Sequence, residues 1–397
     1  MMAFVSSIIA LWGDFMQFLQ RVLWWSIVTI MSIVQAPAKK LEHCHDKIAL
    51  TPHEEAQPRP TMVVFVHGTI LPYLKLGVLK NLVRDFPSNI SYQYTIGDVV
   101  RFHGLYQYQP IADYGLRFFS DTAGVTAVVH GRNQLYAALF GKVWEHAFGT
   151  TICAPYVFGW DGSLSAPRRS FAAQALYASL VRERTAVALA HNCPSTAVDV
   201  VLIAHSHGGS LGLLLAEEET KNHQGLAIEH LVLLGTPIQE ETEHLIHHEL
   251  FHNVWSLYSM GDVVQVLDMV TTKGSSKRTF SLPHQPPKLR QYALELLDEV
   301  TGTTYLPSHV QLWFYDVQNM QPFFLQARSP FNPLPISIFT PLILKLLLSS
   351  PATKGTLCIS KKDYCAHLSL SASGYDKQAI SVPYGLLQPY EKHFLIS

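Results

Sequence analysis

The chain has 397 residues, of which 48% are hydrophobic, and its formal net charge is −1. This length allows one large domain or two modest ones, and the apolar content is enough for a sizeable core. The lysines and arginines are scattered rather than gathered in a basic stripe, which argues against a nucleic-acid-binding protein. The five cysteines are irregularly spaced, so the sequence predicts thiols rather than a disulfide framework.

The first 40 residues are strongly apolar, and only Asp14 and Arg21 are charged before Lys39. Their uncharged run, 22–34, is shorter than the roughly 20 residues that span a bilayer, although extending it back to Phe15 would suffice. We expect residues 1–40 to form a hydrophobic segment that anchors the chain in a membrane or lies on its surface. Two alternatives stay open: a cleaved signal peptide, and an apolar segment packed on the protein's own core.

Lys39 and Lys40 directly follow this hydrophobic segment. If the segment spans a membrane, these positive charges favour a cytoplasmic location for the rest of the chain. We therefore expect a membrane-associated protein whose main domain is cytoplasmic, with secretion as the open alternative. Residues 41–60 are polar and end in prolines, which predicts a linker, and the folded domain should then occupy residues 61–397.

Several short apolar runs follow, and each ends in residues typical of a turn or a reactive site. Runs of about four to eight apolar residues without alternation are typical of strands buried on both faces. Helical patterns rich in Ala and Leu lie before and after the third run. This alternation predicts an α/β domain with a mostly parallel sheet, helices on both faces, and a site at the carboxyl ends of the strands. The runs are 61–69, 156–163, 199–209, 228–237 and 253–262.

A long insert separates the first of these runs from the second. Neighbouring strands normally need far fewer connecting residues. The insert is rich in aromatic residues around 102–119. We expect it to contain a lid over the site within residues 70–150, and ordinary peripheral helices are the open alternative.

A serine stands where the third run turns into a leucine-rich helix, within Ala204-His205-Ser206-His207-Gly208. Apart from its first residue, this stretch matches the pattern G-x-S-x-G, in which a nucleophilic serine occupies a strained turn between a strand and a helix. Ala204 departs from the expected glycine but is still small enough for the turn to close. The helix start also directs unpaired N–H groups at whatever binds there. The plainer interpretation of Ser206 is a helix N-cap.

These motifs together resemble the α/β-hydrolase superfamily, of the serine lipase/esterase type, from about residue 61 to residue 262. "VFVHGT" matches the strand before the oxyanion loop, "AHSHGGSLG" the nucleophile turn, "LGTP" the next strand, and "LYSMGDVV" the strand that delivers the acid. The resemblance implies that Ser206 is the nucleophile and Asp262 the acid, with the N–H groups of Thr69 and His207 as oxyanion donors. Gly-Asp is also a common turn pair, so Asp262 has a purely structural alternative.

The histidine of such a triad follows the acid in the chain, and the sequence contains 20 histidines. His309 is favoured because "SHVQLW" resembles the catalytic-histidine loop of many lipases. Against it, "VQLWFYDV" predicts a strand, which would place His309 at the wrong end of a parallel sheet. His284 follows "KRTFSLP", a candidate short strand, and so satisfies the end-of-strand rule. His367 follows a helical pattern late in the chain, and loss of the base altogether would leave a non-catalytic protein.

A competing motif of another class is the H-E-x-x-H pattern formed by His248, Glu249 and His252. On a helix, the two histidines would face the same way and could bind zinc, with the glutamate as base. A strand pattern begins immediately after His252, and no third ligand follows at metalloprotease spacing. A zinc peptidase is therefore the disfavoured alternative.

The sequence predicts a serine hydrolase that cleaves a carboxylic ester, with Ser206, Asp262 and His309 as the triad and no metal or organic cofactor. An acyl-lipid substrate is expected from the apolar N-terminus and the aromatic insert. The open alternatives are a thioesterase or small-ester hydrolase, and a non-catalytic binding module on the same fold. The sequence makes no prediction of oligomeric state.

Overall fold

The computed structural model describes residues 59–69, 108–112, 114–119, 127–149, 154–163, 165–262, 264–266, 276–316, 329–362 and 365–394. The predicted hydrophobic segment and nearly all of the predicted linker therefore lie outside the described residues. Within the described ranges, no helix combines the length and the apolar character that crossing a membrane requires. The cysteines in these ranges, Cys193, Cys358 and Cys365, are free.

One mixed sheet of 11 strands runs through the described part of the chain, in the order β11-β10-β9-β7-β6-β5-β4-β1-β3-β2, with β8 paired to β7. Strands β3, β1, β4, β5, β6, β7 and β9 are parallel to their neighbours in this run, whereas β2, β8, β10 and β11 pair antiparallel. The predicted α/β class with a largely parallel sheet is confirmed. The strands are β1 (Thr61–Val66), β2 (Gly115–Phe118), β3 (Ala154–Gly159), β4 (Asp199–His205), β5 (Ile228–Leu234), β6 (Phe251–Tyr258), β7 (Leu289–Asp298), β8 (Thr303–Tyr305), β9 (Lys354–Lys362), β10 (Cys365–Ser371) and β11 (Gln378–Pro383).

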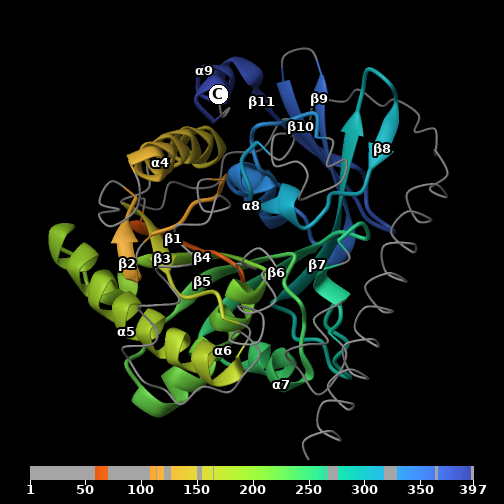
Figure 1. Ribbon diagram of the computed structural model, residues 1–397. Coiled ribbons are helices and arrows are strands. Elements are labelled where there is room, and N and C mark those ends of the chain that lie inside the picture. The colour runs from red at the N-terminus through yellow and green to blue at the C-terminus, as the bar shows by residue number, and fades with distance from the viewer. Residues whose placement is uncertain are drawn as a thin grey trace, which may run out of the picture.

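Helices cover both faces of this sheet (Figure 1). One face carries α5, α6 and the short α7, and the other carries α4, α8 and α9. The helix α5 has a proline in its first turn, where the missing N–H costs nothing because it would have no partner within the helix. The helices are α4 (Ala127–Phe148), α5 (Ala166–Ala190), α6 (His207–Asn222), α7 (Glu240–Glu243), α8 (Thr340–Leu348) and α9 (Gln388–Phe394).

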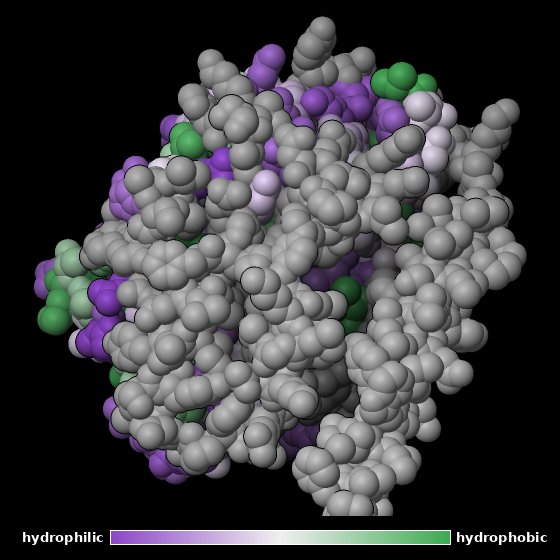
Figure 2. Space-filling view, in the orientation of Figure 1, coloured by the Kyte–Doolittle hydropathy of each residue, from purple (hydrophilic) through white to green (hydrophobic). Residues whose placement is uncertain are grey.

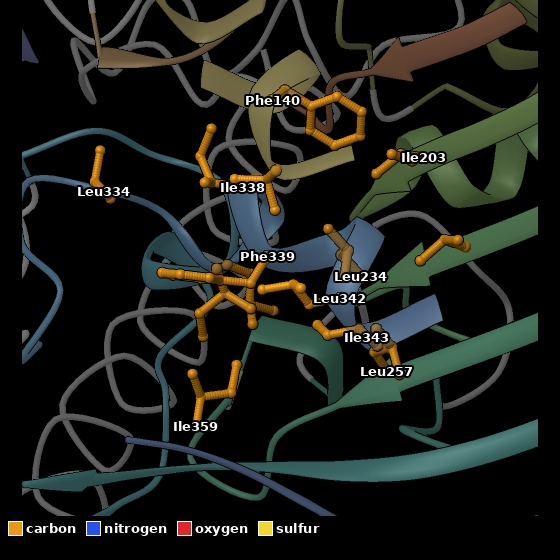
Figure 3. Packing of buried hydrophobic residues seen from close by; sticks show 14 of the residues in the cluster. Phe140, Ile203, Leu234, Leu257, Leu334, Ile338, Phe339, Leu342, Ile343 and Ile359 are labelled. Carbon is orange, nitrogen blue, oxygen red and sulfur yellow. The ribbon is translucent and has the colours of Figure 1, made fainter. Parts of the chain in front are cut away.

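Two apolar cores fill the spaces between the sheet and its helices, because the central strands are apolar on both faces. In the first core, Phe140 of α4 and Leu342 of α8 pack over the side chains of the central strands, among them Ile203 of β4 and Leu257 of β6 (Figure 3). The second core lies between the opposite face and helices α5 and α6. With both faces covered, the sheet can present reactive groups only at the ends of its strands.

The register of the parallel strands aligns their carboxyl ends. Val66 of β1 pairs with Ala204 of β4, and His205 pairs with Leu234 of β5, which in turn pairs with Leu257 of β6. The residues that follow these positions therefore emerge side by side at one edge of the sheet. That edge is where the sequence predicts the site.

Two predicted strands are absent from this fold. The stretch Val310–Leu312 forms a 3₁₀ turn and not the strand expected from "VQLWFYDV". The aromatic side chains that follow it, from Trp313 to Tyr315, are buried in the first core from a loop. The stretch "KRTFSLP" contributes only an isolated bridge between Lys277 and Ile238. Strand β7, which pairs with β6, was not expected from the sequence, because charged and polar residues such as Arg290 and Glu295 interrupt its apolar pattern.

The described parts of the long insert belong to the main layers of the fold. Strand β2 pairs with β3 at one edge of the sheet, and α4 covers one face, with Tyr136 and Phe140 fully buried. The lid predicted within 70–150 stays a prediction, because much of that range lies outside the described residues.

Hydrophobic side chains at the surface are scattered among hydrophilic ones on the face that Figure 2 draws. One of the most exposed is Val300, in the turn between β7 and β8, which is 94% exposed. Isolated groups of this kind are normal for folded proteins and do not define a binding surface.

Candidate active site

Ser206 occupies a strained position at the corner between β4 and α6. Its backbone has φ 53° and ψ −132°, which residues with a side chain rarely adopt. Its N–H is tied to the carbonyl of Leu234 at 2.9 Å. The side chain does not cap the helix, so the N-cap interpretation fails. The backbone of Ser206 is therefore held in a strained conformation, although its hydroxyl does not cap the helix.

The loop after β1 lies directly against this serine. A Cβ atom added to Gly68 would lie 2.5 Å from the Ser206 Cβ and 3.1 Å from its Oγ. Real Cβ atoms do not approach that closely, so only glycine allows the loop to reach the serine. The next residue, Thr69, is thereby placed beside the nucleophile turn, and His207 follows Ser206 in the first turn of α6.

His67 fixes the orientation of the peptide that links Gly68 to Thr69. The His67 Nδ1 lies 2.7 Å from the Gly68 carbonyl oxygen, so this ring nitrogen carries the hydrogen and donates it. In a trans peptide the N–H points away from the C=O. Holding the Gly68 carbonyl toward His67 therefore directs the Thr69 N–H away from His67. The buried Thr69 Oγ1 has no hydrogen-bond partner among the described residues.

A hydrogen bond joins His309 to Asp262, whose Oδ2 lies 2.7 Å from the His309 Nδ1. Asp262 is fully buried after β6, and its other oxygen accepts the N–H of Gln265 at 3.2 Å. Because a carboxylate only accepts hydrogen bonds, the His309 Nδ1 is the donor. The Nε2 of the neutral ring is then the nitrogen that can take a proton.

The same neighbourhood contains His309 and Ser206. The His309 ring lies 4.5 Å, between centroids, from that of His205, the residue before Ser206. A Cβ atom on Gly235, which follows β5, would lie 2.8 Å from the Asp262 Oδ2 and 3.4 Å from the His309 Nδ1. Among the described residues, no hydrogen bond joins the Ser206 hydroxyl to the His309 imidazole. Such contacts often shorten only when substrate binds.

The other two histidine candidates lie elsewhere. His284 is exposed in the loop that precedes β7, where the candidate strand before it did not form. His367 lies in β10, separated from β4 by β9, β7, β6 and β5. At about 4.8 Å per strand, that separation is roughly 24 Å. Of the three, only His309 is brought to the acid and to the neighbourhood of the serine.

The H-E-x-x-H pattern does not lie on a helix. His248 and Glu249 are in a turn, and His252 is in β6. The His248 ring contacts Thr220, whereas the His252 ring bonds to Glu229 at 2.7 Å. His248 and His252 therefore do not share the helix face that the zinc-peptidase interpretation requires. In the part of the chain that the structure describes, no group of three or more His, Cys, Asp or Glu residues could hold a metal ion.

A pocket of about 190 Å³ adjoins the carboxyl end of β3. Phe158, Trp160 and Phe171 line it together with the ion-paired Asp161 and Arg168. The Trp160 ring stacks near His67, and its Nε1–H donates to the His67 carbonyl at 2.8 Å. Trp160 therefore contacts both the pocket and the loop that packs on Ser206. The lining of the pocket is mainly apolar.

Sequence reasoning missed three residues of this neighbourhood: His67, Trp160 and His205. In the sequence, His67 belongs to the His-Gly pair and His205 to the serine motif, and neither pattern indicates a role for the imidazole. For the two histidines, the available signal is the residue type, since an imidazole at the end of an apolar strand is costly unless it has a hydrogen-bond partner. Their partners are backbone carbonyls, which a sequence does not display.

Comparisons with protein-family models, with curated proteins and with solved structures found no match to this chain.

Proposed function

We propose that this protein has the α/β-hydrolase fold and is a serine hydrolase that cleaves a carboxylic ester. The observation that carries the proposal is the buried Asp262–His309 pair next to a serine held at φ 53°. A serine hydroxyl is a weak nucleophile until a positioned base takes its proton. In this proposal, His309 is that base, Asp262 orients its ring, and Ser206 is the nucleophile.

In the proposed reaction, the Ser206 Oγ attacks the acyl carbonyl carbon while the His309 Nε2 takes the hydroxyl proton. The carbonyl electron pair moves to oxygen, and the N–H groups of Thr69 and His207 stabilise this oxyanion. Collapse of the intermediate expels the alcohol, which takes the proton from His309 and leaves an acyl-serine. Water then attacks with the same proton transfers, which releases the acid and restores Ser206. Asp262 stabilises the His309 imidazolium that forms in each half.

Apolar acyl groups suit this site best. The pocket beside His67 is lined mainly by aromatic and aliphatic surface, which favours a hydrocarbon chain over a charged group. A lipid ester and a membrane location remain proposals, because the N-terminal segment and most of the aromatic insert lie outside the described residues. The same chemistry would also cleave a thioester.

The test is labelling with a fluorophosphonate probe, which reacts only with an activated serine. We expect covalent labelling of the wild-type chain at Ser206 and none of Ser206→Ala. The Ser206→Ala protein should keep its thermal unfolding midpoint and lose hydrolysis of p-nitrophenyl esters, because the hydroxyl supports no cap. A wild-type chain that resists the probe would overturn the enzyme proposal and favour a binding module.

A series of p-nitrophenyl esters and matching thioesters then defines the substrate class. We expect kcat/KM to rise from acetyl to medium-chain acyl groups, because the pocket is mainly apolar. A preference for acetyl esters, or for thioesters over oxygen esters of equal chain length, would replace the lipid-ester proposal with one of its alternatives.

A further inference from the structure

His205 is a buried imidazole on an otherwise apolar strand face. It is the last residue of β4 and lies on the same face as Val201 and Ile203, which belong to the first core. Only 2% of its surface is exposed. A polar ring at such a position lowers stability unless its nitrogen atoms find partners, so its contacts show what it does.

Those contacts converge on the loop that carries His309. The His205 Nε2 lies 3.1 Å from the His309 backbone carbonyl oxygen. The ring is stacked on Trp313, with centroids 5.4 Å apart and planes 7° apart. Trp313 follows His309 in the same loop, so a single imidazole contacts both ends of this short turn.

The protonation state of His205 is defined by these surroundings. Burial lowers the pKa of His205 well below its usual range, and the neighbouring His309 lowers it further, so the ring is neutral. A carbonyl oxygen can only accept a hydrogen bond, so the Nε2 of this neutral ring carries the hydrogen. The Nδ1 is buried and has no partner among the described residues.

His309 is the N-cap residue of the 3₁₀ turn Val310–Leu312, so its carbonyl oxygen faces the amides of that turn. In the turn that follows, the N–H of Gln311 bonds to the Ser308 carbonyl, and the N–H of Trp313 bonds to the Val310 carbonyl. The hydrogen bond from His205 adds a side-chain contact to the His309 backbone, while Asp262 contacts the His309 ring.

We propose that His205 is a positioning residue for His309, which it holds by donating a hydrogen bond from Nε2 to the His309 carbonyl and by stacking under Trp313. The proposal rests on the proposed ester hydrolysis. The residue before the nucleophile would then align the base, so that one strand end sets the positions of both. Small displacements of a base are costly, since about 1 Å can lower the rate roughly a hundredfold.

Two substitutions separate the hydrogen bond from the stacking. His205→Phe keeps a flat ring beside Trp313 and removes the donor. His205→Gln loses the ring but can place an amide N–H near the position of the imidazole Nε2. For His205→Phe we expect kcat to fall about ten- to a hundredfold with KM nearly unchanged, because orientation and not binding is lost. The kcat of His205→Gln should stay closer to the wild-type value than that of His205→Phe, because the amide can still donate.

His230→Phe is the matched control. His230 is also a largely buried imidazole beside a tryptophan, since the Trp255 Nε1 donates to its Nδ1 at 3.3 Å, and burial lowers its pKa to about 4. It lies near the amino end of β5, away from the site. Its substitution should leave kcat unchanged. The proposal is overturned if His205→Phe keeps wild-type kcat, or if His205→Gln loses as much as His205→Phe.

NMR of the wild-type chain tests the same contact without relying on activity. Two-bond ¹H–¹⁵N spectra should show His205 as a neutral ring with its hydrogen on Nε2 at neutral pH. Finding the hydrogen on Nδ1, or a doubly protonated ring, would overturn the proposal even if a variant failed to fold. The measurement is independent of hydrolysis, so a failure of the proposed function, seen as no fluorophosphonate labelling, is distinguished from a failure of the His205 contact.

Discussion

The sheet carries a histidine–carboxylate hydrogen bond at each end of its central strands, and both bonds measure 2.7 Å. At the carboxyl ends, the His309 side chain is 12% exposed and that of Asp262 is 0% exposed. At the amino ends, the corresponding values are 52% for His252 and 30% for Glu229. Equal distances therefore describe two different situations. Solvent competes with the second pair and screens it, whereas the first pair is shielded and held in one geometry.

The neighbours of the two pairs differ as well. The buried pair lies beside a strained serine and the loop after β1, whose Gly68 packs on that serine. The exposed pair lies beside Asn253, whose side-chain amide bonds to the Glu229 carbonyl at 3.1 Å. The nearest non-glycine residues with positive φ in the described residues, Asn192 and His223, end helices α5 and α6 and are not nucleophiles. A short hydrogen bond between a histidine and a carboxylate indicates catalysis only when burial and a nucleophile accompany it.

The strongest test of this difference removes the histidine from the buried pair. His309→Ala should lower kcat for a p-nitrophenyl ester by more than about three orders of magnitude, approaching the roughly million-fold loss known for triad residues. His284→Ala and His367→Ala should keep near wild-type rates. If either of these two variants lost activity while His309→Ala kept it, the assignment of the base would be wrong.

The next test changes the acid. Asp262→Asn should lower kcat by about four orders of magnitude, because an amide no longer favours the His309 tautomer with its hydrogen on Nδ1. Glu229→Gln makes the same chemical change in the exposed pair and should alter kcat by less than about twofold. Steady-state kinetics on both variants measures the contrast, and equal losses would remove the distinction between the two ends.

A smaller effect is expected at Gly235, which lies against the buried pair at φ +58°. Gly235→Ala should lower the free energy of unfolding by more than the roughly 1–2 kcal/mol of the left-handed backbone alone, because its Cβ would meet Asp262. Gly225→Ala is the control, since Gly225 has φ +65° and no neighbour within 4 Å. Urea unfolding compares the two, and equal losses would mean that Gly235 is not crowded by the site.

The smallest effect is expected at the exposed pair itself. His252→Ala should change the free energy of unfolding by no more than about 0.5 kcal/mol and leave ester hydrolysis unchanged.

EDTA should have no effect on hydrolysis either, because the proposed mechanism assigns no step to a metal. Loss of activity on chelation, with recovery on adding Zn²⁺, would restore His248 and His252 as candidate ligands.

The sequence predicted the central strands of the fold well and its carboxyl-terminal third poorly. Strands β1, β3, β4, β5 and β6 are continuous apolar runs, because both of their faces are buried. Strands β7, β9, β10 and β11 mix apolar and polar residues, because part of their surface faces water or other polar groups. The pairing of β7 with β6 and with β9 joins segments that are distant in the chain, which no local pattern encodes, whereas β9, β10 and β11 pair with their neighbours in sequence.

For the candidate site, the sequence alone determined which residues stand at the ends of apolar strands: Ser206 in its small-residue turn, Asp262, and the His-Gly pair before Thr69. Each is a local pattern of strand, turn and helix. Only the tertiary structure decided which histidine meets Asp262, because that contact closes a loop of 47 positions between the two residues. It also decided that the stretch after His309 is a turn and not a strand, since the burial of its aromatic side chains against the first core outweighed their local preference for a strand.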